Sequence, residues 1–389
     1  MAQVTIAGII DTAYYSYDGK SRDGTLRLAG QGVGDGSWAG SRIRFSGVED
    51  LGGGTKAEFW LEQGISPTVG EGMNYRTGNN MPQWAGNSTT TSGGIRQAFV
   101  GMSGDFGTIR LGRVYTALYD YIAVTPNTTL QGMPNANVVI NGEFSGTYNA
   151  AWAGDARTKG INYQSPTFGG NFKYYGTYGG VNNDTEVTDV VGADLPGAGY
   201  RSINSRIHTH RLQYTKDAIR AALVYQRKDQ RYGIANAAAS SNYFSATGTA
   251  IGTAPSTNTG ASDTTLVAGY NMGFMDVTGI YGKRVSDATA ATSVVTTTST
   301  EFSQLNFRVP MNRWEFRYTW NQAMASSLVP TTGVTTNNIA WSGSMLGAGY
   351  HFSARTKAYL FTGSEKDDVA TLANTNQATR TALGLFHTF

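Results

Sequence analysis

The feature that most constrains the fold is an alternation of apolar and polar residues with a period of two. Residues 313–320 carry an aromatic side chain at every second position and a charged or hydroxyl side chain at the others. The aromatic positions are Trp314, Phe316, Tyr318 and Trp320. A helix would scatter these aromatic and charged side chains around its circumference, so the pattern predicts a β-strand. The same alternation recurs at residues 41–47, 55–62, 346–352 and 382–389.

The connections between these segments are of two kinds, and the two kinds alternate along the chain. Tight, glycine- or aspartate-containing turns are predicted at residues 48–54, 103–107 and 214–219. Long polar connections are predicted at residues 64–94, 179–205, 234–263, 287–300 and 323–338. Short turns at one rim and long loops at the other are typical of a transmembrane β-barrel, whereas a β-sandwich has no reason to separate them. Each strand also has one charged face, and no second apolar set remains to pair two sheets, so a barrel is favoured over a sandwich.

Composition supports a surface that does not face water everywhere. Only 15% of the residues are charged, against about 25% in a typical soluble protein. The formal net charge is +3 and no block of Lys and Arg occurs, so we expect no nucleic-acid partner. The sequence contains no run of about 18 apolar residues, so no transmembrane helix is predicted. The chain passes from Met1 directly into a strand pattern, and we expect no signal peptide in this sequence.

The length of the chain sets the number of strands. With about 10 residues per membrane crossing and alternating short and long connections, 389 residues fit 16 or 18 strands. Barrels of that size enclose an aqueous channel.

Five segments resemble the general porins of Gram-negative outer membranes, especially those of beta-proteobacteria. The central one is GIRQAFVGMSGDFGTIRLGRVY at residues 94–115; the others are residues 4–11, 41–52, 163–166 and 384–389. The resemblance covers the whole chain in family order. It implies one barrel domain over residues 1–389, with 16 antiparallel strands, long extracellular loops and a third loop, about 113–156, that folds into the pore.

The resemblance also implies partners and a location. The chain is expected in the outer membrane as a homotrimer, in contact with lipid and lipopolysaccharide. Ile6, Ile10 and Leu385 face outward by alternation and are of the type that a trimer interface buries. The C-terminal Phe389 resembles the family's signal for barrel insertion.

The predicted pore constriction contains six residues. Resemblance assigns Arg42 and Arg96 to a basic wall, and strand alternation independently places Arg42 on the polar face. The full set is Arg42, Arg44, Arg96, Arg110, Asp120 and Glu143, the last two acidic and placed on the inward loop. Glu58 and Glu62 share the polar face of their strand and could offset the arginines. A further family arginine falls near Arg157, which alternation places on the lipid side unless a strand end intervenes.

These residues predict a passive diffusion channel for small hydrophilic solutes with a preference for anions, because rings of arginine favour anions. The alternatives are a substrate-specific channel that binds small carboxylates and a non-conducting surface β-protein. No catalytic motif is recognisable, so we expect neither an enzyme nor a cofactor. His208 and His210 share a strand face but lack a third ligand, and no metal site is predicted.

Overall fold

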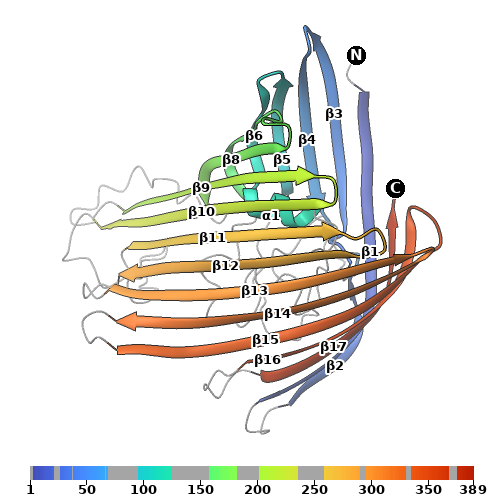
Figure 1. The fold of residues 1–389 in the computed structure, drawn as a ribbon, viewed down its shortest axis with the longest axis vertical. Helices are drawn as coiled ribbons and strands as arrows, with labels where there is room; N and C mark the ends of the chain where they lie inside the picture. Colours follow the sequence, from blue (N-terminus) through green and yellow to red (C-terminus); the bar gives the residue numbers. More distant parts are fainter. Residues whose placement is uncertain are drawn as a thin grey trace, which may run out of the picture.

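The described residues form one antiparallel sheet that closes on itself into a barrel (Figure 1). The structure is a computed structural model, and it describes residues 3–21, 27–36, 38–65, 67–68, 95–124, 157–181, 201–234, 258–289, 295–329, 334–367 and 375–389. Strand β1 pairs with β17 through Ile9–Ser21 and Thr375–Thr388, which joins the two ends of the sheet. In the described part of the chain, no helix is both long and apolar enough to span a bilayer.

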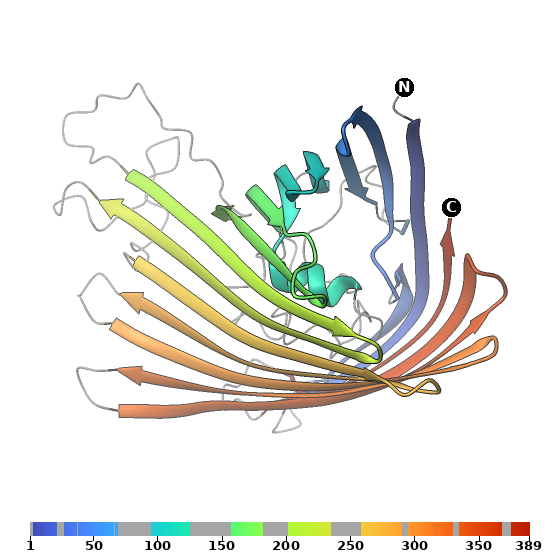
Figure 2. The same ribbon diagram turned by 45° about the horizontal axis from the view of Figure 1, so that its top comes forward.

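The strands fall into a short and a long group. The short-strand wall consists of β3 (Arg42–Gly52), β4 (Thr55–Gly64), β5 (Ile95–Gly104), β6 (Gly107–Tyr115), β7 (Arg157–Gln164) and β8 (Phe172–Val181). The long-strand wall consists of β9 (Arg201–Lys216), β10 (Ile219–Ile234), β11 (Asn258–Asn271), β12 (Asp276–Thr289), β13 (Val295–Met311), β14 (Trp314–Val329), β15 (Val334–His351), β16 (Thr356–Asp367) and β17 (Thr375–Thr388), with β1 (Gln3–Ser21) beside it. The remaining elements are β2 (Arg27–Asp35) and one helix, α1 (Ala117–Val124). Figure 2 shows α1 in the hollow of the curved long-strand wall.

The prediction of sixteen strands was wrong, because the residues that the structure describes form seventeen strands in this sheet. The difference arises because two separate strands, β2 and β3, pair with the same edge of β1. There β2 pairs with residues 12–20 of β1, and β3 pairs with residues 3–9 on the same edge. Between them Trp38 and Ala39 lie off the ladder and are held by the Asp11 side chain, which interrupts the strand.

The tight turns lie where the sequence predicts them. Two-residue connections join β9 to β10 at Asp217 and β13 to β14 at Asn312, and both residues adopt left-handed backbone angles (φ 49° and 56°). Such angles match the twist of a two-residue hairpin. The connections that follow the odd-numbered strands β3 to β15 have two to seven residues and share one end of the barrel, which we call the short-turn rim.

The two faces of the wall differ as the alternation predicts. On β14 the aromatic residues face outward, with exposed fractions from 36% to 45%. Glu315, Arg317 and Thr319, on the other face of that strand, are buried inside the barrel. Leu383 and Leu385 on β17 likewise face outward, each 60% exposed. The barrel therefore has an apolar exterior and a charged interior.

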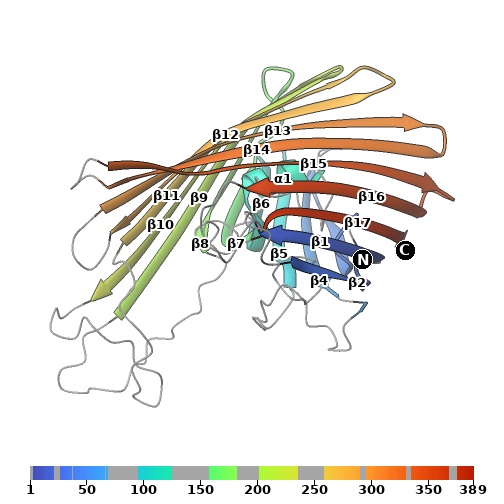
Figure 3. The ribbon, with the colours of Figure 1, turned by 90° about the horizontal axis from the view of Figure 1, so that it is seen from below.

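The two ends of the described chain meet at the β1–β17 seam (Figure 3). The backbone of Gly8 donates to Phe389 at 3.0 Å and accepts from it at 3.2 Å. The ring of Phe389 lies where a side chain of residue 8 would be, so this position admits only glycine.

Candidate functional site

Three charged side chains meet on the inner face of the short-strand wall. Arg96 on β5 donates from Nε to Oε1 of Glu62 on β4 at 2.7 Å. Arg42 on β3 places its Nε 3.9 Å from the other carboxylate oxygen of Glu62. The hydroxyl of Tyr115, at the end of β6, lies 3.3 Å from Nη2 of Arg96. Glu62 is thus shared by two guanidinium groups, which leaves one positive charge uncompensated.

Two further arginines on this wall lie over aromatic rings. The guanidinium carbon of Arg44 is 4.3 Å from the ring centre of Trp60, and that of Arg110 is 5.0 Å from the ring centre of Phe99. The two rings stack with centres 6.2 Å apart and an interplanar angle of 7°. Arg110 also donates to Glu58 at 2.7 Å, whereas Arg44 has no carboxylate within ion-pair distance among the described residues. Stacking of this kind stabilises a guanidinium group without cancelling its charge.

Arg96 faces inward because of an irregularity in the β4–β5 ladder. The register shifts between Glu62 and Gln63, whose ladder positions face Gln97 and Ile95, so position 96 falls at the irregularity of the ladder. Regular alternation from Val100, which is 63% exposed on the outer face, would have turned Arg96 outward. A β-bulge re-aims the side chain at this point.

Arg157, the first residue of β7, also lies inside the barrel. Its guanidinium carbon is 5.2 Å from the ring centre of Tyr115 and 5.4 Å from that of Tyr119 on α1. Alternation along β7 predicts the lipid side, but at the strand end the long side chain turns toward the interior. No carboxylate of the described residues lies within ion-pair distance of Arg157.

Helix α1 is fixed to the inner face of the long-strand wall by Arg211 on β9. Arg211, 1% exposed, donates from Nη1 to the carbonyl of Ala117 at 2.7 Å and to the Asp120 carboxylate at 2.9 Å. Its guanidinium carbon lies 3.5 Å from the ring centre of Tyr175. Asp120, predicted as an acid opposite the basic wall, is therefore neutralised by an arginine that sequence reasoning missed. Glu143 lies outside the described residues.

The apolar side of α1 packs on the same wall. Its buried residues contact a patch contributed by β10–β13; the cluster comprises Ala117, Leu118, Tyr119, Tyr121, Ala222, Val224, Val267, Ile280 and Phe302. The helix thus occupies part of the interior between the two walls (Figure 2).

A second group of charges lines the long-strand wall near the short-turn rim. Alternating arginines and carboxylates connect four strands, β10, β12, β13 and β14, through Arg220–Asp276 (3.3 Å), Asp276–Arg308 (3.3 Å), Arg308–Glu315 (2.9 Å) and Glu315–Arg317 contacts. His351 Nε2 lies 3.8 Å from Glu315. We call this group the rim cluster. It was not predicted, although the alternation on β14 already places Glu315 and Arg317 inside.

Beside the rim cluster, Trp38 and Ala39 are held inside the barrel by Asp11. The buried Asp11 carboxylate accepts from the backbone of Trp38 at 2.8 Å and of Ala39 at 2.7 Å, and from the hydroxyl of Tyr359 at 2.6 Å. The Trp38 ring then stacks on Phe361 with centres 5.4 Å apart.

His208 and His210 lie side by side on β9. The rings of His208 and His210 are 5.5 Å apart, and His210 shares a 2.7 Å hydrogen bond with Tyr174. Among the described residues, no group of three or more His, Cys, Asp or Glu side chains could hold a metal ion.

The sequence matches a known protein family. The sequence model of a family described as Gram-negative porin matches residues 1–370. The chain is 33% identical over 180 residues to outer membrane porin protein 32 of Delftia acidovorans; the matched part is 44% of this chain and 42% of that protein.

Solved structures match over the full length. A structure titled as an anion-selective porin from Comamonas acidovorans has a TM-score of 0.67, 20% identity, and 100% coverage of both chains. A structure titled as the trimer form of OmpT from Vibrio cholerae has a TM-score of 0.62, 12% identity, and coverage of 100% of this chain and 99% of that one. At these identities the structures establish the fold.

Proposed function

We propose that this chain, which belongs to the Gram-negative porin family, is a passive outer-membrane channel for small hydrophilic solutes that prefers anions. Membership of this family makes the protein a channel and not an enzyme. Residues 1–389 are taken as one barrel domain, and residues 113–156 as the loop that narrows its pore. Arg42, Arg44, Arg96 and Arg110 are proposed to line the constriction, with Glu143 on the loop.

The observation that carries the anion preference is the charge of the short-strand wall. Five arginines line its inner face, Arg42, Arg44, Arg96, Arg110 and Arg157, against two glutamates, Glu58 and Glu62. Five positive and two negative charges leave a net +3. The ordered arginines hold this charge in place because ion pairs and aromatic rings fix their positions.

The energy available is sufficient for selectivity. Unit charges 4 Å apart interact by about 4 kcal/mol at an effective dielectric constant of 20, and salt and distance reduce this value. An anion near this wall should therefore gain on the order of 1 kcal/mol over a cation, which corresponds to roughly a fivefold preference.

The experiment is a reversal-potential measurement in a potassium chloride gradient across a planar bilayer. Arg44→Gln with Arg157→Gln is the informative variant, because neither arginine neutralises a described carboxylate and no acid is left unpaired. We expect the chloride preference to fall severalfold in this variant. Lys283→Gln, on the outer face, should leave it unchanged. A wild-type channel that prefers potassium would refute the anion preference, and the absence of any current would refute the channel.

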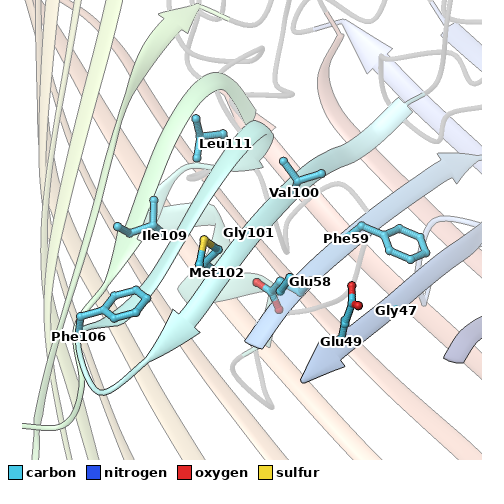
Figure 4. Close-up of a pocket in the computed structure, with 11 residues that line it drawn as sticks. Gly47, Glu49, Glu58, Phe59, Val100, Gly101, Met102, Phe106, Ile109 and Leu111 are labelled. Atoms are coloured by element: carbon cyan, nitrogen blue, oxygen red, sulfur yellow. The ribbon is translucent and has the colours of Figure 1, made fainter. Parts of the chain in front are cut away.

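We also propose that three copies assemble into a trimer through the short-strand wall. The outer face of this wall carries an apolar groove of about 510 Å³ across β3–β6 (Figure 4). Phe59, Val100, Met102, Ile109 and Leu111 line it. Strands β3–β8 have only 8 to 11 residues each, so they span less of a bilayer than the strands of 12 to 18 residues in β9–β17. Another copy would cover this shorter, apolar face.

The rest of the outer surface is proposed to contact lipid and lipopolysaccharide. Outward residues Ile6 and Leu385, which are 59% and 60% exposed, lie next to the seam and would adjoin the interface.

A further inference from the structure

The rim cluster and its neighbours carry more positive than negative charge. Arg220, Arg308, Arg317 and Lys357 face the interior, against the carboxylates of Asp276 and Glu315 and the nearby Asp11. Asp276 and Glu315 each contact two arginines already, and Asp11 accepts hydrogen bonds from Trp38, Ala39 and Tyr359. The remaining positive charge is that of Lys357, which forms no ion pair with a described carboxylate.

The ammonium group of Lys357 lies against two aromatic rings. Its ammonium nitrogen lies 3.8 Å from the ring centre of Trp38 and 4.6 Å from that of Phe386. Among the described residues it has no carboxylate within ion-pair distance and no hydrogen-bond acceptor, although an ammonium group has three N–H donors. The two rings hold the cation in position and leave these donors available.

Its position is fixed from two sides. Lys357 pairs with His351 across the β15–β16 ladder, and His351 lies 3.8 Å from Glu315 of the rim cluster. On the other side, the Asp11 carboxylate holds the backbone of Trp38. Arg308, whose side chain is 27% exposed, presents a second cation from the same wall.

We infer that Lys357, with Arg308 nearby, is a binding site for small oxyanions in transit, separate from the arginines of the short-strand wall and nearer the short-turn rim. A phosphate or carboxylate oxygen can accept the N–H donors of Lys357, which have no acceptor in the described protein. This inference rests on the proposed function. An anion that has crossed the constriction would bind Lys357 before it leaves the barrel.

The test uses inorganic phosphate against a chloride current through the reconstituted oligomer. Phosphate is added on the side of the short turns, which is identified by labelling an Asp105→Cys variant with an impermeant thiol reagent, since the chain has no other cysteine. Lys357→Gln removes a cation without leaving a carboxylate unpaired, and Lys357→Arg retains the charge. Lys283→Gln on the outer face is the matched control.

We expect phosphate to block the wild-type current, and Lys357→Gln to raise the half-blocking concentration about fivefold. Lys357→Arg and Lys283→Gln should stay close to the wild type. Phosphate titration calorimetry on the detergent-solubilised protein gives a second readout that needs no conduction.

The outcomes separate the site from the channel. An unchanged half-blocking concentration in Lys357→Gln, or an equal increase in Lys283→Gln, would overturn the phosphate site while a chloride-selective current upheld the channel. If the protein carries no current, the proposed function fails, and calorimetry decides the site: binding that Lys357→Gln weakens supports it, and binding that is absent or unaffected overturns it.

Discussion

Replacing Arg211 by Met should release α1 from the barrel wall without unfolding the barrel. Arg211 is the one described side chain that holds both the first carbonyl of the helix and the carboxylate of Asp120. An isolated helix of eight residues is not stable in water, so α1 depends on its attachments. Methionine keeps the length and apolar packing of the side chain and removes only the charge and the donors.

The expected cost follows from the burial of the two partners. Breaking a buried ion pair costs about 3–5 kcal/mol. The Asp120 side chain is 28% exposed and regains water when the pair is lost, which places the cost near the lower end, at about 3 kcal/mol. That energy corresponds to a shift of roughly 100-fold in the equilibrium between attached and detached helix.

Hydrogen exchange measured by mass spectrometry reports this equilibrium directly. The amides of residues 117–124 should lose protection by about two orders of magnitude in Arg211→Met, while those of β15–β17, which do not belong to the cluster under α1, should not change. Asp120→Asn provides the second edge of a double-mutant cycle, and the double variant should cost little more than Arg211→Met alone. Equal protection of residues 117–124 in wild type and Arg211→Met would refute the reasoning, because packing on β10–β13 alone would then hold the helix.

Three other substitutions have defined outcomes. Arg96→Gln leaves Glu62, 5% exposed, without its 2.7 Å partner and should destabilise the barrel to urea by about 3–5 kcal/mol; addition of Glu62→Gln should recover most of this, and no recovery would contradict the pairing. Leu223→Arg places a charge on the outer face of β10 and should lower stability in lipid by about 2–4 kcal/mol if it meets the bilayer centre, so an unchanged stability would contradict its lipid contact. Val100→Arg makes the same change in the apolar groove and should yield monomers by mass measurement in detergent, whereas Leu223→Arg should leave the trimer intact; a trimeric Val100→Arg protein would place the interface elsewhere.

The faces of the strands could be predicted from the sequence, because alternation is a local property. Trp314 and Phe316 face outward and Glu315 faces inward because successive side chains of a pleated strand point to opposite faces. The number of strands depended on a contact that no local pattern encodes. The pairing along β1 is interrupted between β2 and β3 because the side chain of Asp11, on β1, accepts the backbone N–H groups of Trp38 and Ala39.

Strand alternation also predicted part of the candidate site. Arg42 and Arg44 lie on the inner face that alternation assigns. Arg96 and Arg157 lie inside because of a ladder irregularity and a strand end, and both are departures from alternation. The role of Asp120 could not be predicted, since its partner Arg211 is 91 residues away in sequence.

The seam between β1 and β17 determines when the barrel can close. The other strand pairs are consecutive in the chain, apart from β1 with β3, but this pair brings residues 9–21 against residues 375–388. Loop-closure entropy must be overcome before such a distant pairing gains any stability, so it is expected to form last and slowly. Until then β1 and β17 each present an unpaired edge that could add a strand of another chain. The growing protein therefore needs protection from association from the synthesis of its first strand until its last has arrived, and the hydrogen bonds between Gly8 and Phe389 mark the point at which that need ends.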